Sequence, residues 1–134
     1  MLNNDLSNKS APILAFNFER VICEEFSLAR FRPNYKLHKQ RINAINKLYW
    51  SYFSIYYITF KYPDRKIDKL EDKLEEEGCL FNGILKVKDL DSLLFWFKQQ
   101  VYVWYFDIDI GIINAVHPFG QLWQDYFIQV WNKE

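Results

Sequence analysis

The sequence predicts one three-layer α/β domain, in which a mostly parallel five-stranded sheet is covered by helices on both faces. Short runs of apolar, β-branched and aromatic residues alternate along the chain with longer stretches whose apolar residues recur at helical spacing. The runs are apolar on both faces, as is typical of strands buried in a parallel sheet. A length of 134 residues, half of them hydrophobic, suits a single domain of this class.

The ends of the chain set the predicted domain boundaries. Residues 1–10 are polar and are predicted to be a disordered lead-in, which leaves residues 11–134 as the domain. The lead-in lacks the basic start and apolar core of a secretory signal, and no apolar run is long enough to span a membrane. We therefore expect a cytoplasmic protein without a membrane partner.

Charge and cysteine content exclude further classes of protein. The chain has 17 basic and 17 acidic residues, and a formal net charge of zero gives no electrostatic footprint for nucleic acid. Cys23 and Cys79 lie in apolar settings and have neither metal-ligand spacing nor a disulfide framework. They are predicted to be buried, reduced thiols.

The first predicted elements are a strand and a helix with an irregular stretch between them. The apolar run at 13–18 reads as a buried strand, and the irregular stretch is expected to end at Pro33. Ile42 and Ile45 then recur at helical spacing, which predicts a helix from about residue 35 to residue 50.

A continuous β-branched and aromatic run at 54–60 predicts a second strand buried on both faces. Pro63 begins the next helix, and Gly78 stands where a helix C-cap is expected. The apolar stripe of this helix consists of Ile67, Leu70 and Leu74.

The remaining predicted elements follow the same alternation. A weaker strand at 80–85 precedes Asp89, which is expected to be the N-cap of a helix. The apolar face of that helix contains Leu90, Leu93, Leu94 and Phe97. Strands at 101–106 and 126–131 complete the five strands of the predicted sheet.

Polar residues follow several of these strands. In a parallel sheet the carboxyl ends of the strands meet at one edge, and ligands bind in the crevice beyond that edge. The segments predicted to share this rim are 17–20, 59–61, 86–88 and 107–109.

In order, spacing and strand context, these segments resemble the motifs of the haloacid dehalogenase (HAD) phosphatases, of the type without a cap domain. The first motif of that family is aspartate, any residue, aspartate and glycine at the end of the first strand. At this place the chain has Asn17, Glu19 and Arg20 around Phe18. The resemblance covers residues 12–131 and implies a HAD-like Rossmannoid fold.

The other three motifs are closer to the family pattern. The second is a threonine or serine that closes the second strand, and it is matched by Thr59. The third is a lysine near the start of a later helix, for which Lys86 and Lys88 are both candidates. The fourth is an acidic pair after the fourth strand, matched by Asp107 and Asp109.

The first motif departs from the family at three positions that matter for its chemistry. In the family the first aspartate attacks phosphorus and also binds magnesium, whereas the amide of Asn17 is a very poor nucleophile and a weaker ligand. Glu19 keeps a carboxyl group but is longer, and a shift of about 1 Å costs on the order of a hundredfold in rate. Arg20 replaces glycine, so it is strained if its φ is positive. Alternatively, its guanidinium fills the phosphate pocket or pairs with Asp107 or Asp109.

The resemblance therefore implies a set of candidate site residues. The catalytic candidates are Asn17 (in the nucleophile position, substituted), Glu19, Thr59 and Lys88, and the weakened metal site is Asn17, Asp107 and Asp109. The residues alone leave structural roles open: backbone hydrogen bonding for Thr59, capping or solvation for the two aspartates, and a solvated surface position for Lys88. The expected cofactor is none, or weakly bound Mg²⁺.

We expect a catalytically impaired HAD-like domain, not a conventional enzyme, that acts by binding a protein partner or by self-association. The altered first motif and the surplus of aromatic residues favour this interpretation. The aromatic residues in question are Trp96, Trp104, Trp123, Tyr126 and Trp131, with core packing as their alternative role. Two alternatives stay open: an active metal-dependent phosphatase or hydrolase in which Glu19, Asp107 and Asp109 hold a metal that activates water, and a sensor that binds a phosphorylated small molecule without cleaving it.

Overall fold

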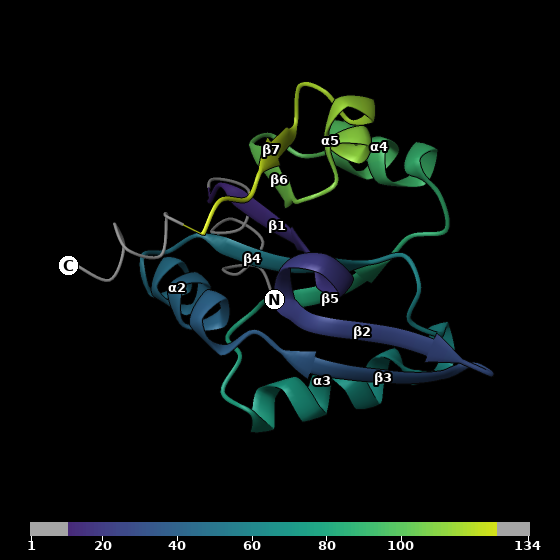
Figure 1. Cartoon of the computed structure of the whole chain (residues 1–134). Helices are drawn as coiled ribbons and strands as arrows, with labels where there is room; N and C mark the ends of the chain where they lie inside the picture. The colour runs from purple at the N-terminus through teal and green to yellow at the C-terminus, as the bar shows by residue number, and fades with distance from the viewer. Residues whose placement is uncertain (1–10, 126–134) are drawn as a thin grey trace.

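The computed structural model of the chain describes residues 11–125 and confirms a five-stranded, entirely parallel sheet (Figure 1). The strands are β1 (Ile13–Asn17), β4 (Ser54–Thr59), β5 (Gly83–Lys86), β6 (Val103–Asp107) and β7 (Gly120–Leu122). Their spatial order is β5-β4-β1-β6-β7, and every neighbouring pair is parallel. The first strand is therefore central, between β4 and β6.

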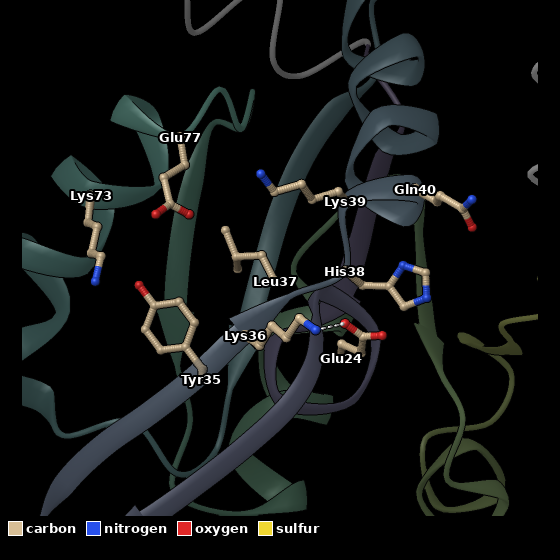
Figure 2. A pocket seen from close by; sticks show the side chains of 9 residues that line it. All are labelled: Glu24, Tyr35, Lys36, Leu37, His38, Lys39, Gln40, Lys73 and Glu77. Atoms are coloured by element: carbon tan, nitrogen blue, oxygen red, sulfur yellow. Dashed lines mark ion pairs between the residues drawn. The ribbon is translucent and has the colours of Figure 1, made fainter.

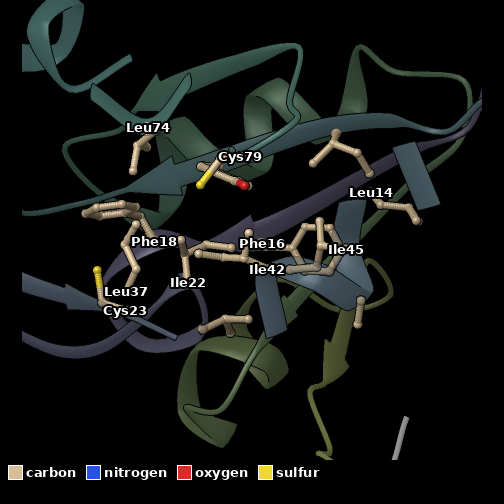
Figure 3. Packing of buried hydrophobic residues seen from close by; sticks show 14 of the residues in the cluster. Leu14, Phe16, Phe18, Ile22, Cys23, Leu37, Ile42, Ile45, Leu74 and Cys79 are labelled. Carbon is tan, nitrogen blue, oxygen red and sulfur yellow. The ribbon is translucent and has the colours of Figure 1, made fainter. Parts of the chain in front are cut away.

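Helices cover both faces of this sheet, as the sequence predicted. They are α2 (Lys39–Trp50), α3 (Ile67–Glu76, after the 3-10 turn η2 at Asp64–Lys66), α4 (Leu90–Lys98) and α5 (Ile110–Ala115). On one face, Ile45 of α2 and Leu74 of α3 pack with Phe16 of β1, as Figure 3 shows. On the other face, Phe97 of α4 packs with Ala15 of β1. The fold is thus a three-layer α/β fold without a separate cap domain among the described residues.

Several helix ends lie where the sequence placed them. The Asp89 carboxylate accepts a hydrogen bond from the Ser92 amide at 2.8 Å and caps α4. Gly78 follows α3 with a φ of 88°, a left-handed conformation that costs glycine little. Cys23 and Cys79 are buried free thiols, as predicted.

The segment between the first strand and the first long helix differs from the prediction. Instead of an irregular stretch, it forms the π-helical turn η1 (Phe18–Ile22) and an antiparallel hairpin of β2 (Cys23–Ala29) and β3 (Arg32–Leu37). The predicted helix start near residue 35 is therefore wrong, and α2 begins at Lys39. Figure 1 shows the hairpin running beside α3, and its two strands form a sheet separate from the main one.

An aromatic cluster holds this hairpin against the core. The ring of Phe18 lies 5.5 Å from Tyr35 and 6.2 Å from Phe26, measured between centroids, so both strands of the hairpin contact it. Tyr62, which follows β4, completes the cluster at 5.9 Å from Phe18. The packing of these rings explains why the segment is ordered although most of its side chains are exposed.

Other strand boundaries shift by a few residues. The third strand of the sheet begins at Gly83, where 80 was expected, and β6 begins at Val103, where 101 was expected. The fifth strand is Gly120–Leu122, and the strand predicted at 126–131 lies outside the described residues. Within residues 11–125, no helix combines the length and apolar character needed to cross a membrane.

Candidate functional site

The ends of three adjacent strands bring most of the predicted site residues together. Asn17 ends β1, Thr59 ends β4 and Asp107 ends β6, and all three are fully buried. Because β1 lies between β4 and β6, Asn17 has Thr59 on one side and Asp107 on the other. This confirms that these segments share the carboxyl rim of the sheet.

The π-helical turn η1 determines where the altered first motif points. The Asn17 Oδ1 atom accepts a hydrogen bond from the Arg20 amide at 2.8 Å and so caps the turn. The turn carries Glu19 toward β4 and Arg20 toward β6, so the two side chains reach different neighbours. Arg20 is not among the residues with positive φ, so the predicted alternative of a strained Arg20 is wrong.

Arg20 forms a bidentate ion pair with Asp107. Its Nε donates to Oδ1 and its Nη2 donates to Oδ2, each at 2.8 Å. The Arg20 side chain is 23% exposed, whereas the Asp107 side chain is fully buried. Hydrogen bonding to Asp107 raises the pKa of the Arg20 guanidinium above its ordinary value, so the guanidinium keeps its positive charge. Of the roles considered for Arg20, pairing with Asp107 is the one that the structure shows.

Tyr105 completes what we call the rim network, formed by Asn17, Arg20, Tyr105 and Asp107. Its hydroxyl donates to Asp107 Oδ2 at 2.6 Å and accepts a hydrogen bond from Asn17 Nδ2 at 3.0 Å. Asp107 Oδ1 also accepts the Ile108 amide at 2.7 Å. Burial, together with the charge of Asp107, raises the pKa of the Tyr105 hydroxyl. Both carboxylate oxygens of Asp107 and both polar atoms of the Asn17 amide therefore have protein partners.

Glu19 forms a separate group with the end of β4. Its carboxylate accepts hydrogen bonds from the Thr59 hydroxyl and, at 3.0 Å, from the Phe60 amide. The Thr59 hydroxyl also accepts a hydrogen bond from the Tyr62 amide at 3.1 Å. Hydrogen bonding to nearby backbone was the structural role that the sequence left open for Thr59. Burial raises the pKa of Glu19 above its ordinary value, although the hydrogen bonds from Thr59 and Phe60 oppose the shift.

Among the described residues, the side chains of the two candidate lysines bond to other partners than these groups, although Lys86 pairs with Thr59 in the register of β4 and β5. The Lys86 Nζ donates to the Tyr62 carbonyl and lies 3.5 Å from the Asp64 carboxylate. Lys88 is exposed, which agrees with the solvated surface position that the sequence left open for it. Both lysines line a cavity of about 700 Å³. The other residues lining it are Phe31, Phe60, Pro63, Asp64 and Arg65.

Asp109 has a structural role. Its Oδ1 accepts a hydrogen bond from the Ile112 amide at 3.2 Å, which makes it the N-cap of α5. Its own amide is directed at Asp107 Oδ1, at 3.3 Å. Capping was the structural alternative that the sequence left open for this residue.

The residues at the rim do not fit a magnesium ion. Mg²⁺ needs free oxygen ligands, but the oxygens of Asp107 are engaged by Arg20 and Tyr105, and Asn17 Oδ1 caps η1. The guanidinium also brings a positive charge into the place where a cation would bind. Between residues 11 and 125, no group of three or more His, Cys, Asp or Glu side chains is arranged to hold a metal ion. Glu19, Asp107 and Asp109 thus do not form the metal site considered from the sequence.

The prediction from sequence missed Tyr105 as a member of the site. Tyr105 and Asp107 are two residues apart on β6, so their side chains lie on the same face of the strand. That spacing was a usable signal, because a buried tyrosine hydroxyl needs a polar partner.

A cavity of about 750 Å³ lies elsewhere, between β3, the start of α2 and the end of α3 (Figure 2). Its lining carries both signs of charge, and Lys36 pairs with Glu24 at 3.3 Å. None of the site residues predicted from the sequence, and none of the rim network, lines this cavity.

Among known proteins, this chain is matched by solved structures but not by sequences. The sequence matches no protein-family model, and no curated protein sequence matches it. A structure described as a 3-deoxy-D-manno-octulosonate 8-phosphate phosphatase from Vibrio cholerae matches with a TM-score of 0.54 at 12% identity, over 85% of this chain and 66% of that protein. A hypothetical protein from Xanthomonas campestris matches with a TM-score of 0.55 at 12% identity, over 88% of this chain and 66% of that protein.

A third structure carries ligands. It is a 3-deoxy-D-manno-octulosonate 8-phosphate phosphatase from Moraxella catarrhalis in complex with magnesium, phosphate and the sugar acid, and it matches with a TM-score of 0.53 at 14% identity, over 87% of this chain and 68% of that protein. This chain thus spans about two thirds of the length of these proteins. It has the HAD-like α/β fold that its order of motifs predicted.

Proposed function

We propose that this chain is a HAD-like domain that no longer catalyses phosphoryl transfer and acts by binding protein, including a second copy of itself. The observation that carries the first part is the bidentate pair between Arg20 and Asp107. It places a fixed positive charge beside the amide that replaces the nucleophilic carboxylate. A substrate phosphate would face Asn17, which cannot attack phosphorus effectively.

The position of Glu19 supports the same proposal. A general acid must reach the leaving group, but the Glu19 carboxylate is turned to Thr59 and the Phe60 amide, and the residue is only 6% exposed. The three altered positions of the first motif therefore serve three different structural contacts. One caps a turn, one bonds to β4 and one pairs with β6.

The binding part of the proposal rests on surface composition. Large apolar side chains with more than 60% exposure in the described part of the chain are Phe31, Trp50, Tyr52, Phe95, Val101, Tyr102 and Ile110. Core packing accounts for Trp123, which is buried, but it does not account for these side chains. Where such side chains gather in one patch, they are typical of a surface that binds another protein.

The test is hydrolysis of p-nitrophenyl phosphate in the presence of Mg²⁺, with the unaltered chain and the Asn17→Asp and Asp107→Asn variants. We expect no turnover above the protein-free rate in any of the three, because Asn17→Asp alone leaves Arg20 paired with Asp107. Turnover by the unaltered chain that requires Mg²⁺ and is lost in Asp107→Asn would show that catalysis persists. Turnover by Asn17→Asp alone would show that Arg20 does not close the site.

A further inference from the structure

Exposed apolar side chains gather at the amino ends of the strands, the side of the sheet opposite the rim. They are Trp50 (70% exposed), Tyr52 (88%), Val101 (70%), Tyr102 (63%) and Trp104 (46%). We call this group the aromatic edge. Four of its five members are aromatic, and all lie before or at the start of two strands, β4 and β6.

Strand pairing shows that these residues lie on the same edge. Ile13, the first residue of the central strand, is paired with Ser54 of β4 on one side and Val103 of β6 on the other. The Ile13 amide donates to the Tyr102 carbonyl at 2.9 Å, and the Ser54 amide donates to the Pro12 carbonyl at 3.0 Å. The loops that precede β4 and β6 therefore flank the start of β1, about 10 Å apart.

The backbone of Tyr52 adds an independent observation. Its φ is 70°, a left-handed conformation that is unfavourable for a residue with a large side chain. Glycine or asparagine would suit this position after α2 better. The Tyr52 ring is 88% exposed, so packing among the described residues does not explain why an aromatic residue is held there. Strained residues cluster at functional sites, and contact with a partner is a role that an exposed aromatic ring can serve.

The area of the aromatic edge is in the range that a dimer needs. A fully buried aromatic side chain covers about 150–250 Å², so these four, at their observed exposures, present on the order of 600 Å². With Val101 the area approaches the ~800 Å² per partner that a stable interface buries.

The lack of charged residues in the two loops of the aromatic edge favours one kind of partner. Residues 50–53 and 99–102, which form the loops before β4 and β6, contain no charged side chain. Such a surface can meet an identical surface without repulsion between like charges, whereas an acidic or basic partner gains nothing from it. A two-fold contact places the same patch on both sides, which suits a self-complementary apolar surface.

From these observations we infer that two copies of this chain associate through the aromatic edge. The inference rests on the proposed function, because it names the partner and the surface of the binding role. It uses none of the residues of the rim network, which lie at the other end of the strands. The rim can therefore stabilise the fold while the opposite edge binds.

The experiment is size-exclusion chromatography with light scattering on the full chain over a range of protein concentrations. Two variants remove rings from the edge, Tyr52→Gly and Tyr102→Ala. The matched control is Leu28→Ala, which shortens an apolar side chain that is 38% exposed on strand β2 of the hairpin, away from this edge. Thermal melts followed by circular dichroism establish that each variant is folded, and Tyr52→Gly is expected to melt no lower than the unaltered chain because glycine relieves the positive φ.

We expect the unaltered chain and Leu28→Ala to form dimers with the same dissociation constant. Tyr52→Gly and Tyr102→Ala should each weaken the dimer by tenfold or more. A strict monomer at all concentrations would overturn the inference, as would a dimer that both edge variants leave unchanged. The hydrolysis assay does not depend on the molar mass measured by light scattering. A monomer would therefore overturn the dimer alone, and turnover would overturn the non-catalytic assignment alone.

Discussion

The guanidinium of Arg20 and the carboxylate of Asp107 share two hydrogen bonds of 2.8 Å, and together they join the turn after β1 to the end of β6. The two residues are 87 positions apart in the sequence. A long-range pair of this geometry fixes the relative position of the two strand ends. In the proposed function, the pair occupies the place that a catalytic site would otherwise use.

The effects on stability of removing the two partners of this pair should not be additive. Arg20→Ala leaves the carboxylate of Asp107 buried and without its counter-ion, and we expect a loss of about 3 kcal/mol in the free energy of unfolding. In Arg20→Ala with Asp107→Asn, no uncompensated charge remains, so the double variant should be less destabilised than the sum of the singles. Urea denaturation of all four proteins measures the coupling. Strictly additive effects would show that the two side chains do not interact in solution.

The hydroxyl of Tyr105 should contribute measurably to stability. Tyr105→Phe leaves the Asn17 Nδ2 and Asp107 Oδ2 atoms without one partner each in a buried environment, and we expect a loss of about 1–3 kcal/mol. The matched control is Tyr102→Phe in the segment just before β6. The Tyr102 side chain is 63% exposed, so loss of its hydroxyl should cost little. An equal effect of the two substitutions on the denaturation midpoint would contradict the rim network.

Glu19 should make stability depend on pH in a predictable direction. Its pKa is raised by burial, so the folded state binds the proton more tightly than the unfolded state. Stability is then greatest below the ordinary pKa of glutamate and falls as the pH rises from that value through the raised pKa. Glu19→Gln removes this titration while keeping a side-chain oxygen for the Phe60 amide.

We therefore expect Glu19→Gln to gain stability relative to the unaltered chain as the pH rises. Denaturation midpoints of the two proteins from about pH 4 to about pH 8 provide the measurement. The difference between them should grow with pH and then become constant above the raised pKa. A difference that shrinks as the pH rises would mean that the pKa of Glu19 is lowered in the folded state.

The order of elements was predictable because period and composition change clearly along most of the chain. The buried strands contain continuous apolar runs, and residues such as Asp89 and Gly78 end or begin helices through local hydrogen bonds and φ preferences. The hairpin was not predictable by these signals. Its side chains are mostly exposed, and its turn residues, Arg30 and Phe31, adopt positive φ without a glycine, asparagine or aspartate to signal it.

The site was predictable in position but not in its pairing. The rule that parallel strands share a carboxyl rim placed Asn17, Thr59 and Asp107 together, as observed. The sequence left Arg20 with several roles, because its partner depends on the direction that η1 gives its side chain. A π-helical turn of five residues has no clear sequence signal, so the choice of Asp107 needed the structure.

The proposed function requires that the Arg20–Asp107 pair leaves no place for a metal ion, and titration with Mg²⁺ followed by calorimetry tests this most directly. We predict no heat of binding for the unaltered chain and no rise in its melting temperature with millimolar Mg²⁺. The reason is that the carboxylate oxygens of Asp107 already accept hydrogen bonds from Arg20 and Tyr105. Asp107→Asn serves as the control and should give the same flat titration. A saturable heat of Mg²⁺ binding to the unaltered chain that disappears in Asp107→Asn would contradict the account.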